Sequence, residues 1–382
     1  MGFPRGKSAF VSGATFGIGE APGYSDTDLA AHAVLDALEK VNLRPGDIDG
    51  LFAAMPSDPF GQITLAQYMG IYPKILEGNR TGGSSFQTHA HIAAHLIASG
   101  EIETAVIAYG SNQRSAAGGL VSSPRVSPYQ APYRPMQPIS SYALAASRHM
   151  HEYGTTKEQL AEVAVAARKW ANLNPDAFMQ GNLSVDEVVN ARIISSPLGK
   201  FDCCLVTDGA AAVVMTSADR AKDIVNAPAY LLGAGQAATH WDILSMPDLT
   251  ATAAAESGKR AFAAASVTPD QIDVVELYDA FTINTILFLE DLGFCPKGEG
   301  GRFVEGGAIA PGGQLAVNTN GGGLSCVHPG MYGLFVMYEA IEQIMGTAGK
   351  RQQADVNLAV AHGNGGTLSS QATLILGSEA TL

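Results

Sequence analysis

The segment 82–89, with the sequence GGSSFQTH, leads from two glycines directly into a predicted helix. Enzymes often place an attacking Cys or Ser at the start of such a helix, but this segment has no Cys and no base beside its serines. The main-chain N–H groups at a helix start attract partial negative charge. We therefore predict that Gly83, Ser84 and Ser85 bind the oxygen of an oxyanion or thioester. A plain Gly-rich helix entry is the structural alternative.

A second segment, ELYDAFTINT at 276–285, places two ionisable side chains between a buried strand and a helix. Ligands gather at the carboxyl ends of strands in α/β folds, and Tyr278 and Asp279 stand at such an end. Both are therefore candidate catalytic residues. The alternative is an ordinary Asp helix cap beside a packed Tyr.

The third segment, NTNGGGLSCVHPGMYG at 318–333, combines glycines with an acid–base pair. Three consecutive glycines permit close approach of the backbone to a ligand. His328 titrates near neutrality, and Tyr332 follows four residues later, on the same face if the segment is helical. We expect His328 and Tyr332 to be catalytic and Asn320 to bind substrate. A structural His-Pro loop is the alternative.

A fourth Gly-rich turn, AVAHGNGGTLSS at 359–370, follows another predicted strand and contains His362 and Asn364. We expect both side chains to line the substrate site. A purely structural turn is the alternative.

Composition limits the classes of function. The 382 residues carry a net charge of −13, so no broad basic surface recruits nucleic acid or an anionic membrane. The four cysteines have no metal-ligand spacing, and we interpret them as reduced and intracellular. We expect the adjacent Cys203 and Cys204 to lie in a buried strand, because a free cysteine behaves as a small apolar residue. The N-terminus has no apolar core of a signal peptide, and no stretch reaches the length of a membrane span. We expect a cytoplasmic protein with no metal in this chain.

The same order of predicted elements occurs twice along the chain. Residues 27–54 read as helix, turn and strand, and residues 251–281 repeat that order, with Asp49 and Asp273 at equivalent points. Glycine pairs then precede a helix and a strand in each half. Such self-similarity predicts a duplicated α/β unit with mixed or parallel sheets covered by helices. We place the N-terminal half at 1–225 and the C-terminal half at 226–382.

Residues 114–200 interrupt this pattern. Five prolines between 124 and 138 argue against a sheet, because proline fixes φ and lacks a donor. Thr155 and Glu158 form a plausible capping box for a helix that follows. We assign 114–200 to an inserted loop subdomain that covers the substrate.

One motif points to a dehydrogenase and is set aside. The segment VSGATFGIGEA at 11–21 is similar to the Gly-rich turn of short-chain dehydrogenases, and Tyr153 and Lys157 form Y-x-x-x-K. That chemistry needs Tyr and Lys one turn apart on one helix, but Gly154 between them ends helices. No acidic residue stands where the ribose would need one. We expect 11–21 to form a tight turn after the first strand.

Taken together, these segments resemble the thiolase superfamily, especially thiolases of the sterol-carrier-protein-x type. The resemblance covers essentially the whole chain. NTNGGGLSCVHPG is similar to the family's glycine-histidine-proline motif, FDCCLVTDGAAAVVM to its D-G-A-A-A strand, and ELYDAFT to its Asn- or His-containing loop. The resemblance implies a duplicated five-layer αβαβα fold, usually dimeric, that acts on coenzyme A thioesters.

The departures from the thiolase pattern matter more than the matches. The position of the family's nucleophilic Cys falls at Gly83 or Ser84, and the second Cys at Ala361 or His362. The family's oxyanion-hole Asn or His corresponds to Tyr278, and only His328 is retained. Claisen cleavage through an acyl-enzyme is therefore not expected.

This pattern resembles the Cys-less thiolase-like aldolases of steroid side-chain degradation, which work with a DUF35 protein that has an OB-fold and a zinc ribbon. The resemblance implies retro-aldol cleavage of a β-hydroxyacyl-CoA, with either Tyr278 or Tyr332 as the base and the other as the acid, and with His328 and Asp279 as relay. It also implies a homodimer joined by DUF35 subunits into a heterotetramer. Two alternatives stay open: acyl transfer through Ser84, Ser85 or Cys326, and a non-catalytic scaffold that binds acyl-CoA.

Overall fold

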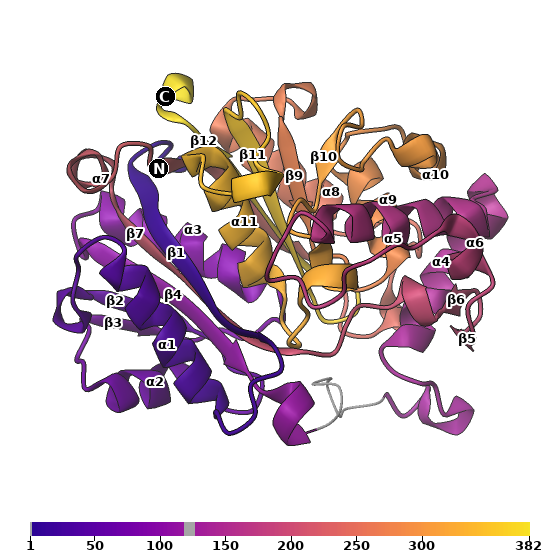
Figure 1. Ribbon diagram of the computed structural model, residues 1–382, viewed down its shortest axis with the longest axis horizontal. Coiled ribbons are helices and arrows are strands. Elements are labelled where there is room, and N and C mark those ends of the chain that lie inside the picture. The colour runs from indigo at the N-terminus through magenta and orange to yellow at the C-terminus, as the bar shows by residue number, and fades with distance from the viewer. Residues whose placement is uncertain (1, 118–126) are drawn as a thin grey trace.

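The computed structural model describes residues 2–117 and 127–382 (Figure 1). Their main feature is a mixed sheet of ten strands in the order β10-β9-β11-β12-β8-β1-β7-β4-β2-β3. Its strands are β1 (Ser8–Gly19), β2 (Gly50–Ala53), β3 (Ile75–Glu77), β4 (Thr104–Ser111), β7 (Asp208–Ser217), β8 (Ala229–Ala238), β9 (Val274–Leu277), β10 (Ala316–Val317), β11 (Leu358–Gly365) and β12 (Ser370–Gly377), and a separate pair comprises β5 (Ile193–Ser195) and β6 (Leu198–Gly199). The helices are α1 (Asp26–Glu39), α2 (Gly61–Met69), α3 (Ser85–Ala98), α4 (Ile139–Tyr153), α5 (Lys157–Ala171), α6 (Val185–Val189), α7 (Ala218–Ile224), α8 (Ala254–Ala265), α9 (Thr282–Asp291), α10 (Gly300–Phe303) and α11 (Gly333–Met345).

The sheet consists of two copies of one five-stranded unit. Its two halves, β3-β2-β4-β7-β1 and β10-β9-β11-β12-β8, have the same order and the same sequence of parallel and antiparallel neighbours. They join where β1 pairs with β8, Ala9 opposite Tyr230 and Phe10 opposite Ala229. The predicted repeat and mixed sheet are therefore confirmed. The division of the chain at residue 225 stays a prediction.

The repeat extends to single hydrogen bonds. The carboxylate of Asp49 accepts the main-chain N–H of Thr104, at the start of β4, at 3.3 Å. Its counterpart Asp273 accepts the N–H of Leu358, at the start of β11, at 2.9 Å. Each aspartate thus ties the turn before a parallel strand to the strand beside it.

The elements form five layers. α3 and α11 contact each other and both half-sheets, whereas α1 covers the outer face of the first half and α8 that of the second (Figure 1). Small residues on α3, such as Ala90, Ala93 and Ala94, let the half-sheets approach this central layer closely. β11 is buried throughout, as expected of a strand covered on both faces. The predicted five-layer αβαβα arrangement is confirmed.

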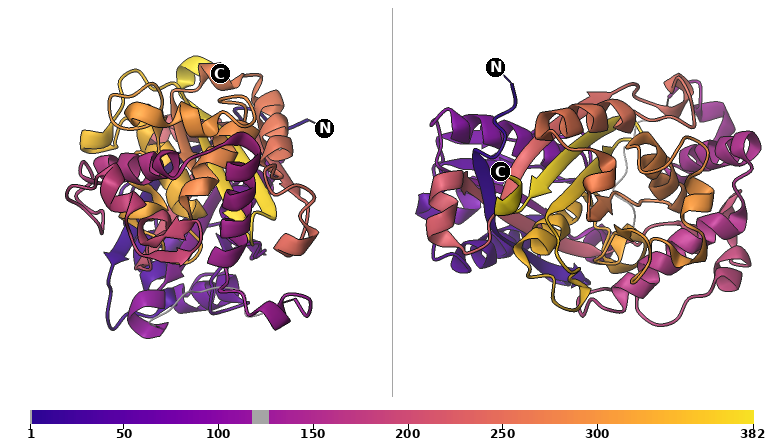
Figure 2. Two further views of the ribbon diagram at one scale, coloured as in Figure 1. Left: turned by 90° about the vertical axis from the view of Figure 1, so that its right-hand side faces the viewer. Right: turned by 90° about the horizontal axis from the view of Figure 1, so that it is seen from above.

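The inserted region supplies α4, α5 and α6. α4 and α5 pack against α9, and Figures 1 and 2 place them against the C-terminal half. The predicted cap is wrong by one residue: Thr156 caps α5 and pairs with Gln159, because Thr155 instead bonds the ring of His149. Part of the proline-rich segment, 118–126, lies outside the described residues.

Tyr153 ends α4, Gly154 is left-handed with φ 76°, and Lys157 begins α5. The two residues of the dehydrogenase-like motif therefore lie on different helices, as predicted.

Two local predictions were wrong. Residues 11–19 belong to the long strand β1 and form no tight turn after it, because they pair with β7. Cys203 and Cys204 do not lie in a buried strand: they precede β7, are half-buried, and bridge to Phe281 and Ala280.

Candidate active site

The four predicted segments converge. The main-chain N–H of Tyr278 donates to the carbonyl of His362 at 3.1 Å, which joins the second and fourth segments. Gly83 of the first segment lies against the Tyr278 ring, so that a Cβ on Gly83 would lie 2.0 Å from Cε2 of that ring. A Cβ on Gly333, the last residue of the third segment, would lie 1.9 Å from the carbonyl oxygen of Gly83. Glycines at these positions allow the segments to meet.

Three aromatic rings form the centre of the site. Tyr278 meets His328 edge-on, with ring centroids 5.4 Å apart, and meets Tyr332 edge-on at 5.7 Å. The rings of His328 and Tyr332 stack at 5.9 Å. All three side chains are buried. The predicted Tyr–Tyr–His grouping is therefore one contiguous cluster.

Both phenol hydroxyls donate to carbonyl oxygens. The hydroxyl of Tyr278 donates to the carbonyl of Gly330 at 3.1 Å and accepts the main-chain N–H of Tyr332 at 3.2 Å. The hydroxyl of Tyr332 donates to Oδ1 of Asn320 at 2.9 Å. Asn320 thus orients Tyr332 directly. Its Oδ1 also accepts the N–H of Gly322 at 2.7 Å.

Burial sets the protonation states of the three rings. It raises the pKa of Tyr278 and of Tyr332 well above 10, so both phenols are protonated at neutral pH. The N–H of Tyr332 opposes that rise at Tyr278, because it stabilises a phenolate oxygen. Burial lowers the pKa of His328 to about 4, and neither ring nitrogen has a hydrogen-bond partner among the described residues. His328 is therefore a neutral imidazole with both nitrogens available.

Asp279 shapes the glycine run. Its carboxylate accepts the N–H of Gly323 at 2.6 Å and that of Leu324 at 3.4 Å. A Cβ on Gly322 would lie 2.0 Å from its Oδ2, so only glycine fits there. Burial raises the pKa of Asp279 to about 7, against the opposing effect of these N–H donors. No hydrogen bond joins its carboxylate to the ring of His328 in the described structure.

Neither serine hydroxyl at the helix start hydrogen-bonds a histidine in the described structure. Ser84 Oγ donates to Ser370 Oγ at 2.9 Å, and Ser85 Oγ accepts the N–H of Thr81 at 2.8 Å. A serine nucleophile needs a base in contact with its hydroxyl. The geometry therefore does not favour acyl transfer through either serine.

The polar atoms of His362 and Asn364 are used within the protein. The ring of His362 bonds Thr373 at 2.8 Å and Gln371 at 3.0 Å, and burial lowers its pKa to about 3. The amide of Asn364 donates to the hydroxyl of Tyr142 at 3.1 Å and accepts from Gln371 at 2.7 Å. These contacts hold the fourth segment in place.

Sequence reasoning missed two residues of this site. Tyr142, on α4, links the inserted region to Asn364, and burial raises its pKa to about 12. Gln87 donates to the carbonyl of Gly333 at 2.8 Å, and its Oε1 is buried with no partner among the described residues. Gln87 could have been found from its position, because it is a polar residue on a buried helix, four residues after Gly83.

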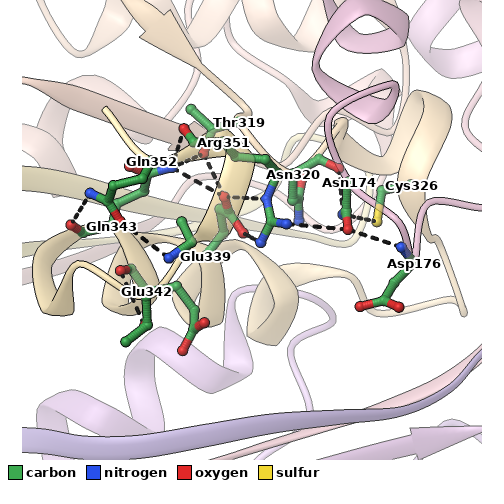
Figure 3. A network of polar contacts seen from close by, with 12 residues as sticks. Asn174, Asp176, Thr319, Asn320, Cys326, Glu339, Glu342, Gln343, Arg351 and Gln352 are labelled. Atoms are coloured by element: carbon green, nitrogen blue, oxygen red, sulfur yellow. Dashed lines mark hydrogen bonds and ion pairs between the residues drawn. The ribbon is translucent and has the colours of Figure 1, made fainter. Parts of the chain in front are cut away.

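Asn320, which accepts the hydroxyl of Tyr332, also belongs to a wider polar network (Figure 3). Arg351 forms a two-pronged ion pair with Glu339, at 3.0 and 2.9 Å, and its Nη1 donates to Asn174 at 3.3 Å. Asn174 donates in turn to the carbonyl of Asn320, at 2.9 Å, and to Sγ of Cys326, at 3.4 Å. Burial raises the pKa of Cys326, so its thiol is a weak nucleophile.

Within residues 2–117 and 127–382, no three His, Cys, Asp or Glu side chains gather as they would around a metal ion. No helix in the same residues is long and apolar enough to cross a membrane.

The chain is similar to several known proteins. Residues 235–378 match the family described as thiolase C-terminal domain-like. An acetyl-CoA acetyltransferase of Methanothermobacter thermautotrophicus is 41% identical over 60% of this chain, and the match spans only 60% of that relative. A 17-hydroxy-3-oxo-4-pregnene-20-carboxyl-CoA lyase of Mycobacterium tuberculosis is 33% identical over 90% of this chain and 92% of its own length.

Among solved structures, the Ltp2-ChsH2(DUF35) aldolase superposes with a TM-score of 0.89, at 32% identity and 98% coverage of both chains. Together with the match to the lyase over nearly its full length, this likeness fixes the family. The chain belongs to the thiolase superfamily, in the thiolase-like group that includes the Mycobacterium tuberculosis lyase.

Proposed function

We propose that this chain is a carbon–carbon lyase that cleaves a β-hydroxyacyl-CoA thioester by a retro-aldol reaction, releasing a ketone or aldehyde and a short acyl-CoA. One observation carries the proposal: the Tyr278 ring fills the space where a nucleophile at position 83 would project, and two phenols and a neutral imidazole replace the thiol. The full-length likeness to a protein named as a CoA lyase, and to one titled an aldolase, supports it.

The reaction needs a base, an enolate site and an acid. The base takes the proton of the β-hydroxyl group, the bond between the α and β carbons breaks, and its electron pair forms the thioester enolate. The acid then protonates the α carbon. No thiol takes part, and each positioned acid or base contributes roughly 10²–10⁴-fold.

The hydrogen bonds suit Tyr278 as the base and Tyr332 as the acid. Tyr278 receives the N–H of Tyr332, which stabilises a phenolate, whereas the hydroxyl of Tyr332 is held as a donor. Because both phenols start protonated, the base must pass its own proton on. An unpartnered ring nitrogen of His328 takes that proton from Tyr278 and returns it to Tyr332 after Tyr332 has protonated the α carbon. The net transfer is then from the β-hydroxyl group to the α carbon, and both phenols end protonated. Asp279 supports this relay by holding the glycine run that precedes His328.

Charge develops on the thioester oxygen as the enolate forms. In the turn at Gly83, Ser84 and Ser85, which begins α3, we assign this role to main-chain N–H groups, because the hydroxyl of Ser84 already donates to Ser370. Preorganised donors of this kind stabilise the transition state strongly in a buried site. We assign Asn320, His362 and Asn364 to the lining of the substrate site, and their hydrogen bonds also hold the surrounding loops in place.

The proposal includes partners. Coenzyme A carries phosphate charges, but this chain has 23 Lys and Arg residues against 36 Asp and Glu. Part of the CoA site is therefore assigned to another chain, a DUF35 protein, in line with the name of the superposed Ltp2-ChsH2(DUF35) aldolase. A homodimer is proposed through β3, an edge strand near which Leu76, Tyr68 and Tyr72 are exposed. Two DUF35 subunits complete a heterotetramer in the cytoplasm.

The test uses the purified protein, with and without a co-expressed DUF35-type partner, and a β-hydroxyacyl-CoA that bears a tertiary hydroxyl. No free CoA is added, and mass spectrometry follows the products. Release of a ketone and a short acyl-CoA is the expected result. Cleavage of a β-ketoacyl-CoA only when free CoA is supplied would indicate thiolysis instead, and tight binding without turnover would indicate a scaffold.

A further inference from the structure

Gly83 has an ordinary backbone conformation but no room for a side chain. Its φ is outside the left-handed region that favours glycine, so a larger residue would meet no backbone penalty. A Cβ built there would nevertheless lie 2.0 Å from Cε2 and 2.6 Å from Cδ2 of Tyr278. Real Cβ atoms essentially never lie within 3.0 Å of another heavy atom, and the optimal separation of two carbons is about 3.5–4.0 Å. Space alone therefore excludes a side chain at position 83.

The Tyr278 ring is not free to move aside. Its hydroxyl is held at 3.1 Å by the carbonyl of Gly330 and at 3.2 Å by the N–H of Tyr332. The rings of His328 and Tyr332 flank it. Swinging the ring away would break both hydrogen bonds and both ring contacts in a buried site. These contacts hold the ring in the space beside Gly83.

We propose that Tyr278 and a side chain at position 83 exclude each other, and that this pair of positions determines which class of reaction the site performs. A nucleophile at 83 requires a smaller residue at 278, whereas a tyrosine at 278 requires glycine at 83. The consequence for reaction class rests on the proposed function. The steric exclusion itself rests only on the geometry.

The exclusion has a second, fixed contributor. The carbonyl oxygen of Asn364 would lie 2.7 Å from the same Cβ, and a main-chain atom moves less readily than a side chain. Trimming Tyr278 should therefore relieve the larger part of the clash and leave a remainder. The expected result is therefore a partial recovery of stability when Tyr278 is truncated.

The first experiment measures thermal unfolding of Gly83→Ala in three backgrounds: the native chain, Tyr278→Phe and Tyr278→Ala. Because Phe keeps the ring, Gly83→Ala should lower Tm by several degrees in the native and Tyr278→Phe backgrounds. In the Tyr278→Ala background the loss should shrink by more than half. Gly46→Ala is the control, since a Cβ there meets nothing within 4 Å and its φ is not left-handed. An equal loss in all three backgrounds, or no loss in any, would overturn the proposal.

The second experiment uses Gly83→Cys and alkylation by iodoacetamide, located by peptide mass spectrometry. The new thiol should be modified at least 10-fold faster in the Tyr278→Ala background than in the Tyr278→Phe background, where the ring covers it. Equal rates would contradict the exclusion. Neither experiment depends on turnover, so failure of the proposed lyase reaction would show separately, as no cleavage by the native chain.

Discussion

The hydroxyl oxygen of Tyr278 accepts the main-chain N–H of Tyr332 at 3.2 Å, so the backbone of one proposed catalytic residue supports the side chain of the other. The bond uses an N–H at the start of α11, where donors have no partner within the helix. It favours negative charge on Tyr278, and it fixes the two rings relative to each other. The two tyrosines should therefore be treated as one unit.

Removing either hydroxyl should abolish most of the activity and leave the fold intact. Tyr278→Phe and Tyr332→Phe should each lower kcat by about 10²-fold or more, because each removes a positioned proton donor or acceptor. Turnover of the β-hydroxyacyl-CoA and circular dichroism provide the measurements. Tyr230→Phe is the matched control: Tyr230 is buried on β8, and its hydroxyl has no partner in the described structure. Near-native rates in both site variants would remove the tyrosines from the mechanism.

The candidate nucleophiles should be dispensable. Ser84→Ala, Ser85→Ala and Cys326→Ala should each keep kcat within about 10-fold of the native value, because neither serine hydrogen-bonds a histidine in the described structure and the thiol pKa is raised. Mass spectrometry of the protein incubated with substrate should detect no acyl adduct. A 10³-fold loss in any one variant, together with an adduct in the native chain, would restore acyl transfer as the reaction.

Asn320 should act through Tyr332. Asn320→Leu removes the acceptor of the Tyr332 hydroxyl and should lower kcat roughly 10-fold with a smaller change in KM, because a misplaced acid affects the chemical step. Asn320→Asp keeps both acceptor bonds, to Tyr332 and to Gly322, and should recover most of the rate. Equal losses of activity in the two variants would show that Asn320 does not act through its hydrogen bond to Tyr332.

The sequence could predict the four segments because each carries a local signal, which is a glycine run, a titratable residue at a strand end, or both. The repeat was visible because Asp49 and Asp273 do the same work in each half. The contact between Gly83 and Tyr278 could not be predicted, because glycine has no side chain and the residues are far apart in the chain. Tyr142 was missed for a similar reason, since it reaches the site from the inserted region. The cap at α5 was placed one residue early because adjacent threonines both fit the pattern.

Buried histidines should make stability depend on pH. Burial lowers the pKa of His89 to about 3, below the ordinary value of 6.5, so the unfolded chain binds a proton more readily. The stability contribution is present above pH 6.5 and is lost as the pH falls. Between pH 6 and 4, the free energy of unfolding of the native chain should fall about 1.4 kcal/mol per pH unit more steeply than that of His89→Leu.

Urea unfolding of both proteins at a series of pH values checks this slope. Asp279 acts with the opposite sign, because its raised pKa of about 7 makes the folded chain bind the proton more readily. That effect is common to both proteins and cancels in the comparison. Parallel curves for the native chain and His89→Leu would contradict the assignment.

The ion pair between Arg351 and Glu339 should contribute to stability far more than an exposed pair, and it should also affect the site. The side chains are 12% and 1% exposed, so Arg351→Met leaves a buried carboxylate without its partner. Breaking such a pair costs about 3–5 kcal/mol. The exposed pair of Arg302 and Glu299 is the control, and Arg302→Met should change Tm by no more than about 1–2 °C.

The same substitution should also affect the site. Arg351 is linked to Asn320 through Asn174, so kcat measured well below Tm should fall in Arg351→Met, by less than in Asn320→Leu. A lower Tm with an unchanged kcat would show that the network supports the fold and does not position Tyr332.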